Sequence, residues 1–537
     1  MAYQEFHNST DAVFESRKII DLDGTPLHET ESGCLLRRVI TQNGTILLKQ
    51  YIAAWDLRSA GIPVAEIESH DPFYVAVASG SLDALCLLLD VHRDNANSVS
   101  IEERGFTLLN VACAHAQIDI VKFLLDSDPH LGTVNDKDQG GWTPIMSAAY
   151  STGALAAADR VRGEAVMNLL LDRGASARDA VPFPIGINIA RGAHPEPQAE
   201  FTVLSLAITG SSYGMVKRLL EHGADAQERL RLYSEGSGFW DDGIDVRDVT
   251  ILHLGSQCWN VDGIRAVLDH SDHDGEGRSK GSDLIYCRDS MGRLPLHWAA
   301  AGDDPALEGL RSENTLTGAI AGTFELLVPK DGEATATDLI NAQDKKGATP
   351  LHYAVSAHAR CGKKGSEHAY HTVQWLCSRG GDASIIDCRG QSVLHRLAHP
   401  SLDGEPLDLR LIDLLLDHGA PLDYADENGE TALHIMARNL RQVAATRILI
   451  ERGARVGVVN RKGNTPLHEA VRGELRPRLS WDGQRQEGVT LEDRLRAQDE
   501  VWQALVDVDG SLMGKANKEG KTPRQLREET RQKWIRM

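Results

Sequence analysis

Short apolar stretches alternate with polar turns along most of this 537-residue chain. Many stretches open with Thr and Pro, where the Thr hydroxyl can cap a helix and Pro fits the first helical position. A small residue follows at a fixed offset, as at Ala354 and Ala470, and a second apolar run comes next, as at 411–416. Many second runs close with Gly-Ala, as at Gly223-Ala224, and glycine suits a left-handed residue just past a helix end. The pattern predicts pairs of antiparallel helices, each with a tight turn and a polar loop.

The opening of the pair recurs as nearly the same six residues. It is clearest at 347–352 and 463–468, and it returns in altered form at 141–146, 292–297, 390–395 and 429–434. One helix pair cannot bury its apolar face alone, so neighbouring pairs must stack. The chain is therefore expected to be a repeat protein, whose core grows in one dimension with length.

The repeated phrase resembles the opening of the ankyrin repeat. The resemblance implies an all-α, curved solenoid of helix-turn-helix repeats with finger loops, with about ten full repeats plus caps. Most gaps between successive openings exceed the family period of about 33 residues, which indicates insertions. Long insertions of this kind are similar to those of multi-ankyrin proteins from filamentous fungi.

The expected organisation is an N-terminal extension over 1–32 and a solenoid over 33–531. The segment 24–28 matches the repeat opening, but no second helix follows at the right distance, so it is assigned to the extension. The expected repeats lie near 33–55, 71–90, 105–126, 141–175, 201–225, 249–270, 289–328, 344–383, 387–423, 426–456 and 460–509, with a cap at 517–531. Insertions are expected between repeats at 180–198, 226–248 and 271–285, and within repeats at 153–163, 302–322, 358–370 and 473–496.

Composition narrows the class of partner. A net charge of −20 argues against nucleic acid or an anionic membrane as direct partner, because either requires local Lys and Arg. No apolar stretch approaches the length of a membrane span, and the first residues lack the basic and apolar regions of a secretory signal. The eight cysteines contain no Cys-x-x-Cys pair, which favours reduced thiols. We therefore expect a cytoplasmic or nuclear protein, or one found in both, that is not secreted.

The resemblance implies that finger loops and first helices line a concave, partner-binding face. Finger positions of the later repeats carry six basic residues against two acidic ones, although the chain as a whole is acidic. This local excess predicts a basic stripe that binds an acidic segment of a protein partner. Trp142 takes a finger position that the family commonly uses for contact, so it is a candidate anchor. The candidate partner-binding residues are Trp142, Arg293, Lys345, Lys346, Arg389, Glu427, Asn428, Glu430, Arg438, Arg461, Lys462 and Asn464, with Arg472 near the same face.

A histidine and cysteine cluster is the strongest candidate for metal chemistry. His358, Cys361, His368 and His371 have offsets that would allow one tetrahedral zinc, which would staple an inserted loop. The alternative is a solvated loop without metal, with His371 at the start of the second helix. The resemblance implies a structural role, as hydrogen bonds between adjacent loops, for the recurring histidines His253, His297, His352, His395, His434 and His468.

Three functional interpretations remain open. The first is a non-enzymatic protein-binding scaffold without cofactor, expected to be monomeric, such as a regulatory adaptor or a transcriptional co-regulator that acts through a protein partner. The second is a cytosolic adaptor of a signalling or ubiquitin-ligase complex. The third is an enzyme or zinc protein built on the solenoid. No catalytic residue is assigned, because 210–214 matches the nucleophile-elbow pattern but lacks the preceding strand that the motif needs.

Overall fold

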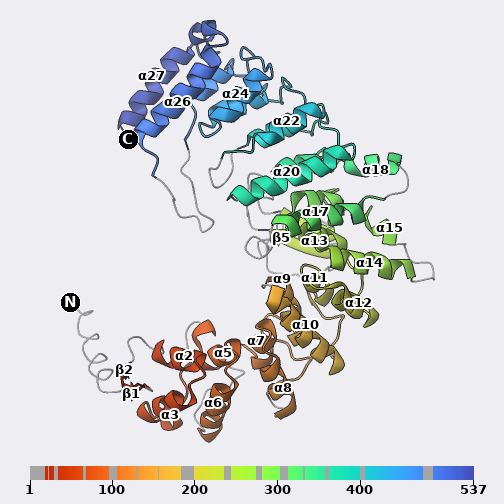
Figure 1. The fold of residues 1–537 in the computed structure, drawn as a ribbon, viewed down its shortest axis with the longest axis vertical. Coiled ribbons are helices and arrows are strands. Elements are labelled where there is room, and N and C mark those ends of the chain that lie inside the picture. The colour runs from red at the N-terminus through yellow and green to blue at the C-terminus, as the bar shows by residue number, and fades with distance from the viewer. Residues whose placement is uncertain are drawn as a thin grey trace, which may run out of the picture. The chain divides into compact units, whose positions relative to one another are not determined.

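The computed structural model describes most of the chain: residues 18–21, 23–28, 34–64, 68–95, 104, 106–127, 131–154, 157–182, 199–234, 244–273, 281–302, 313–329, 333–356, 362–399, 406–475 and 488–536. The chain divides into two compact units, Met1–Ala226 and Gln227–Met537, called unit 1 and unit 2 below. Each unit is a series of helix pairs (Figure 1).

Unit 1 begins with two short antiparallel strands, β1 (Lys18–Ile20) and β2 (Pro26–His28). Its helix pairs are α2 (Cys34–Thr41) with α3 (Thr45–Ala54), α5 (Pro72–Ala78) with α6 (Leu82–Asp94), α7 (Leu108–Ala114) with α8 (Ile118–Ser127), α9 (Pro144–Ala154) with α10 (Ala157–Asp172), and α11 (Val203–Ala207) with α12 (Tyr213–Glu221). Shorter elements are α4 (Leu57–Ala60), the 3-10 turn η1 (Glu68–His70), and the strands β3 (Ala180–Pro182) and β4 (Ala199–Thr202).

The first strand pair anchors the start of unit 1. Strand β1 packs against α3, where Ile19 is buried and the Ile20 N–H donates to Gln50 Oε1 at 2.9 Å. The segment 24–28, which resembles a repeat opening, therefore contributes a strand rather than a helix start.

Unit 2 continues the helix pairs. They are α13 (Ile251–Gln257) with α14 (Val261–His273), α16 (Pro295–Ala301) with α17 (Glu313–Leu327), α19 (Pro350–Ser356) with α20 (Gly362–Ser378), α21 (Val393–Ala398) with α22 (Arg410–Asp417), α23 (Ala432–Arg438) with α24 (Val443–Glu451), and α25 (Pro466–Val471) with α26 (Leu491–Val506). The helix α27 (Pro523–Arg536) closes the unit. Additional elements are the strands β5 (Leu230–Ser234) and β6 (Ile244–Val249), the helices α15 (Gly281–Leu284) and α18 (Glu333–Ile340), and the 3-10 turn η4 (Gly510–Gly514).

Helices of unit 2 stack in two layers. The first helices of successive pairs contact one another in chain order from α13 to α25. The second helices do the same from α14 to α26, and Figure 1 shows them in this order. Leucine and alanine fill the space between the layers, as at Leu351, Ala354, Leu394 and Leu415, which are all fully buried. This continuous apolar seam is what the stacking of helix pairs requires.

Each first helix of unit 2 starts with the same hydrogen-bonded cap. At Thr431, for example, the backbone N–H donates to Nδ1 of His434 three residues later, at 3.1 Å. The Nε2 of that histidine then reaches the next repeat, where it lies 3.1 Å from the Asn464 carbonyl oxygen. The other five recurring histidines make the equivalent contact, to Arg293, Ala348, Gln391, Glu430 and Lys521. The expected hydrogen bonds between adjacent loops are thus present.

Finger loops of unit 2 are joined by their backbones. The N–H of Cys388 donates to the Lys346 carbonyl at 2.8 Å, and the N–H of Arg461 donates to the Asn428 carbonyl at 2.8 Å. Similar bonds, from Lys345 to Met291, from Glu427 to Arg389 and from Lys518 to Lys462, complete a ladder that we call the finger ladder. Gly463 has a φ of +75°, and a Cβ there would lie 2.8 Å from Lys518 N. Glycine is therefore required at this point of the phrase.

The fold class expected from the sequence, an all-α ankyrin-type repeat fold, is confirmed. The short strands β3 to β6 were not expected, and they lie at the margins of the predicted insertions 180–198 and 226–248. Among the described residues, no helix combines the length and apolar character needed to cross a bilayer.

Candidate partner-binding groove

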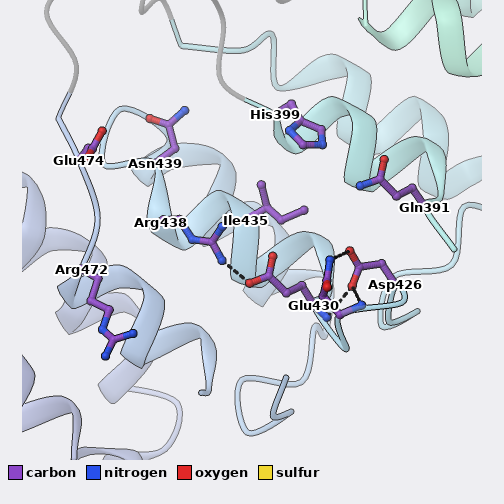
Figure 2. Close-up of a pocket in the computed structure, with 10 residues that line it drawn as sticks. Gln391, His399, Asp426, Glu430, Ile435, Arg438, Asn439, Arg472 and Glu474 are labelled. Atoms are coloured by element: carbon purple, nitrogen blue, oxygen red, sulfur yellow. Dashed lines mark hydrogen bonds and ion pairs between the residues drawn. The ribbon is translucent and has the colours of Figure 1, made fainter. Parts of the chain in front are cut away.

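A groove of about 390 Å³ lies on the first-helix side of unit 2. Its walls come from the α21, α23 and α25 repeats and their finger loops (Figure 2). It is lined by Gln391, His399, Asp426, Asn428, Glu430, Ile435, Arg438, Asn439, Arg472 and Glu474. Asn428, Glu430, Arg438 and Arg472 among these were expected on a partner-binding face.

The loop that precedes α23 forms one wall, and Asp426 organises it. Oδ1 of Asp426 accepts the backbone N–H groups of Asn428 and Glu430, both at 2.8 Å. Its Oδ2 receives the Asn428 side-chain amide at 3.4 Å, which is long for a hydrogen bond. The Asp426 residue is only 9% exposed, so this carboxylate is held in place at the wall of the groove.

Arg438 lines the groove at the end of α23. Its guanidinium bonds Glu430, and its Nε donates to Glu469 Oε2 at 2.9 Å. Burial works against the charge on Arg438, but the two carboxylates outweigh it, so the pKa of Arg438 is raised. Burial likewise works against the charge on Glu469, but Arg438 and the amides of Asn464 and Asn460 lower the pKa of that carboxyl. Both groups stay charged and hold each other in place.

The other wall belongs to the α25 repeat. Arg472 lines the groove and pairs with Glu519 at 3.2 Å. The backbones of 439–440 and 474 are also joined, because the Leu440 N–H donates to the Glu474 carbonyl at 3.2 Å. The two repeats are therefore tied together beside the groove as well as through their fingers.

The groove itself is not basic. Asp426, Glu430 and Glu474 line it against Arg438 and Arg472, and both arginines are paired with carboxylates. The basic character expected of this face is confined to the finger loops, in a set that we call the fingertip cations. They are Lys345, Lys346, Arg389, Arg461 and Lys462, which are exposed except for the half-buried Lys346.

Two expected contact residues are instead buried, which corrects the sequence interpretation. Arg293 is 2% exposed, and its Nε donates to Asp289 Oδ2 at 2.6 Å, while Asn464 is fully buried. Both follow the finger glycine directly. The carbonyl of that position accepts the histidine of the preceding repeat, so its side chain lies between repeats rather than at the tip. Glu427 and Asn428, at the tip, are exposed as expected.

Trp142 lies in unit 1, on the finger loop before α9. Its ring is half-buried and packs edge-on against Tyr150, with centroids 5.7 Å apart, and at a tilt against Phe201 at 5.6 Å. Its backbone is fixed too, because its N–H donates to Asp138 and its carbonyl accepts Asn110 Nδ2 at 2.8 Å. Trp142 is thus a rigid aromatic surface residue, and its role as an anchor stays a prediction.

The structure describes two of the four candidate zinc ligands. His358 and Cys361 lie outside the described residues, whereas His368 and His371 are both on α20. The His368 ring packs edge-on against Trp259, with centroids 5.7 Å apart. Within the part of the chain that the structure describes, no three His, Cys, Asp or Glu side chains gather as metal ligands would. A four-residue zinc site stays a prediction.

The family model for ankyrin repeats matches this chain three times, at residues 73–180, 358–458 and 404–476. The matched segments have the sequence of ankyrin repeats. The matched segments fall in both units, and the last two include the repeats that form the groove.

Several curated relatives are similar to part of this chain at low identity. The chain is 25% identical over 209 residues to transient receptor potential cation channel subfamily A member 1 of Homo sapiens, covering 39% of this chain and 15% of the channel. It is 28% identical over 209 residues to NF-kappa-B inhibitor zeta of Homo sapiens, covering 34% of this chain and 26% of the inhibitor. It is also 28% identical over 225 residues to the B-cell lymphoma 3 protein homolog of Mus musculus, covering 41% of each. The chain spans less than half the length of these relatives.

Sequence reasoning missed six of the groove residues: Gln391, His399, Asp426, Ile435, Asn439 and Glu474. One of them, Ile435, could have been found by comparing the repeats with one another in the sequence. In four repeats of unit 2, the residue nine positions after the finger Asp or Asn is polar or aromatic, namely Trp298, Tyr353, Arg396 and Glu469. In the α23 repeat it is Ile435, and this break in the pattern marks the groove.

Proposed function

We propose that this chain is a non-enzymatic, protein-binding scaffold that acts as a regulatory adaptor or transcriptional co-regulator. The observation that carries the proposal is the groove of about 390 Å³ on the first-helix side of unit 2, bordered by rigid, cross-linked finger loops. A recessed surface on a preorganised scaffold binds a segment of another protein at a low cost in ordering. The partner is a protein, with no nucleic acid and no membrane bound directly, and the scaffold is monomeric.

The fingertip cations give the partner its expected charge. The finger ladder fixes the backbones of their loops, so the cations stand in consecutive repeats instead of on independent loops. Glu427 is the acidic residue among these tips. A run of acidic residues in the partner would complement this row, increasing the rate of association and the sensitivity to salt.

Two of the relatives support a regulatory role. One carries the name of an NF-kappa-B inhibitor, and such a protein regulates another protein through binding. The second, the B-cell lymphoma 3 protein homolog, is similar to this chain over a comparable length. By this analogy we propose that the chain acts in the cytoplasm, the nucleus or both, with a regulatory protein as its partner.

The experiment first captures the partner by chemical cross-linking and mass spectrometry, and then measures its affinity in purified form. The test variant is Lys345→Glu, Lys346→Glu, Arg389→Glu and Lys462→Glu. The matched control makes the same charge change at exposed cations on second helices and on the closing helix: Lys122→Glu, Arg265→Glu, Arg447→Glu and Lys533→Glu. We expect a loss of roughly tenfold or more in affinity for the test variant alone. Equal affinity of both variants would discard the acidic partner segment.

Localisation tests the regulatory part of the proposal. A fluorescently tagged chain is expected to enter the nucleus under at least one growth condition in which the partner is present there. A signal that stays cytosolic under all conditions would remove the co-regulator role. The cytosolic adaptor would then be the better description.

A further inference from the structure

The finger Asp or Asn of unit 2 normally has a partner nine residues later. Tyr353 Oη donates to Asp344 Oδ2 at 2.7 Å, and Arg396 donates to Asp387 Oδ2 at 2.7 Å. Trp298 Nε1 donates to Asp289 Oδ2 at 3.0 Å. In the α25 repeat the polarity is reversed, and Asn460 Nδ2 donates to Glu469 Oε1 at 3.1 Å. Thus the first helix of each of these repeats closes over its own finger loop.

The α23 repeat departs from this rule. The residue nine positions after Asp426 is Ile435, which has no donor. Among the residues that the structure describes, Oδ2 of Asp426 is left with the Asn428 amide at 3.4 Å, although the Asp426 residue is 91% buried. The groove lies at this point, and Figure 2 shows Ile435 projecting from α23 beside Arg438. The groove is therefore the space that a polar side chain fills in the neighbouring repeats.

We propose that the groove binds an arginine side chain of the partner, which supplies to Asp426 Oδ2 the donor that Ile435 cannot. The inference rests on the proposed function, because it names the residue that a bound segment inserts. Arg396 with Asp387 is the internal example of the same pair, one repeat earlier.

Charge and shape favour a guanidinium over a neutral donor. Asp426, Glu430 and Glu474 line the groove, and both of its arginines are engaged by carboxylates. Ile435 is 8% exposed and borders the groove. The methylene stem of an arginine would contact this apolar edge, and its planar head would meet the carboxylate. An arginine followed by acidic residues would satisfy the groove and the fingertip cations together.

Two variants test the groove, and each copies an arrangement that another repeat of the chain already has. Asp426→Asn keeps the Oδ1 acceptor that organises the loop, as Asn460 does for its own loop with bonds of 3.0 Å to Lys462 N and Asn464 N. It replaces the Oδ2 acceptor with an amide donor. Ile435→Arg copies the Arg396 arrangement and fills the groove from within. Both variants are expected to keep the thermal midpoint of the wild-type chain, and Ile435→Leu is the control that keeps the groove apolar at this point.

The experiment selects peptides from a random phage-displayed library on the full chain. We expect enriched sequences to contain arginine, and replacement of that arginine by citrulline, which keeps the shape and removes the charge, to weaken binding roughly tenfold or more. Asp426→Asn and Ile435→Arg should weaken the same peptides to a similar extent, and Ile435→Leu should not. If Ile435→Arg fails to fold, Asp426→Asn and the citrulline peptide still decide the question.

The outcomes separate this inference from the proposed function. Enriched peptides without arginine, or peptides that bind Asp426→Asn as well as they bind the wild-type chain, would overturn the arginine pocket. If those same peptides no longer bind the variant with the reversed fingertip charges, the proposed function is supported without the arginine pocket. Arginine peptides that bind the charge-reversal variant as tightly as the wild-type chain would support the arginine pocket and contradict the acidic segment. A selection that enriches no peptide would overturn both.

Discussion

The Nε2 atom of His434 lies 3.1 Å from the carbonyl oxygen of Asn464, which joins the first helix of one repeat to the finger loop of the next. The other ring nitrogen, Nδ1, accepts the backbone N–H of Thr431 at 3.1 Å. A neutral ring with its proton on Nε2 satisfies both bonds. A second proton, on Nδ1, would break the helix cap, so the contact between repeats depends on the charge state of the histidine.

Acid is therefore expected to destabilise unit 2 before its carboxylates titrate. Burial lowers the pKa of His253 to about 4, of His297 to about 3 and of His352 to about 4, against about 6.5 in an unfolded chain. These groups stabilise the fold fully above pH 6.5, and the stabilisation is lost as pH falls toward the folded values. Each costs about 1.4 kcal/mol per pH unit in that window. The thermal midpoint should drop between pH 7.5 and pH 5.

The variant His297→Gln provides the control for this pH dependence. It removes one titrating ring, so the difference in thermal midpoint between pH 7.5 and pH 5 should become smaller, whatever the loss of stability at neutral pH. A wild-type midpoint that does not move over this range would contradict the neutral, buried state of the rings.

Gly463→Ala should destabilise the finger ladder. The residue has a φ of +75°, and the added Cβ would meet the Lys518 backbone nitrogen at 2.8 Å. The left-handed conformation alone costs about 1–2 kcal/mol for a residue with a Cβ. Gly318→Ala, within α17 and with no atom within 4 Å of the new Cβ, is the matched control and should be neutral or slightly stabilising. Calorimetry of the two variants would compare them, and equal midpoints would argue against a steric need for Gly463.

The buried ion pair of Arg293 and Asp289 should matter much more than the exposed pair of Arg472 and Glu519. Arg293→Ala leaves the Asp289 carboxylate, which is 4% exposed, without its cation, an effect typically worth about 3–5 kcal/mol. Arg472→Ala breaks a pair whose members are 35% and 58% exposed and should cost about 1 kcal/mol or less. Chemical unfolding of both variants measures the contrast. Similar losses would mean that Arg293 is not buried as described.

Thiol labelling should separate the cysteines by position. Cys388 is exposed on a finger loop, whereas burial raises the pKa of Cys377 to about 12 and raises the pKa of Cys113 further. Iodoacetamide reacts with thiolates, so Cys388 should be modified in the native chain while Cys113 and Cys377 react only after denaturation. Peptide mass spectrometry reads the sites, and modification of Cys113 in the native chain would contradict its burial.

Much of the fold could be predicted from local chemistry. The Thr-Pro-Leu-His phrase defines helix starts at Thr349 and Thr465, because the cap, the proline and the histidine act within four residues. Strands β3 to β6 escaped prediction, since each spans three to six residues and their pairing joins segments separated along the chain. Short strands without strong alternation leave little periodic signal.

The candidate site was only partly predictable for a different reason. The tips Lys345, Arg389 and Lys462 were assigned correctly to exposed loops, because the residues before a finger glycine face solvent. Arg293 was misplaced, because the position after that glycine turns toward the next repeat. The groove depends on Ile435 standing where the neighbouring repeats have a polar or aromatic side chain. This difference is found only when the repeats are compared at the position nine residues after the finger Asp or Asn.

The finger ladder also has a mechanical consequence. An interior finger, such as the one at Glu427, bonds to the loop on each side, whereas a terminal finger bonds on one side. When force is applied along unit 2, the outermost repeat therefore resists with half the cross-links of an inner one. Such a chain should yield in small, successive steps from an end and act as a spring, not as a block that breaks at once.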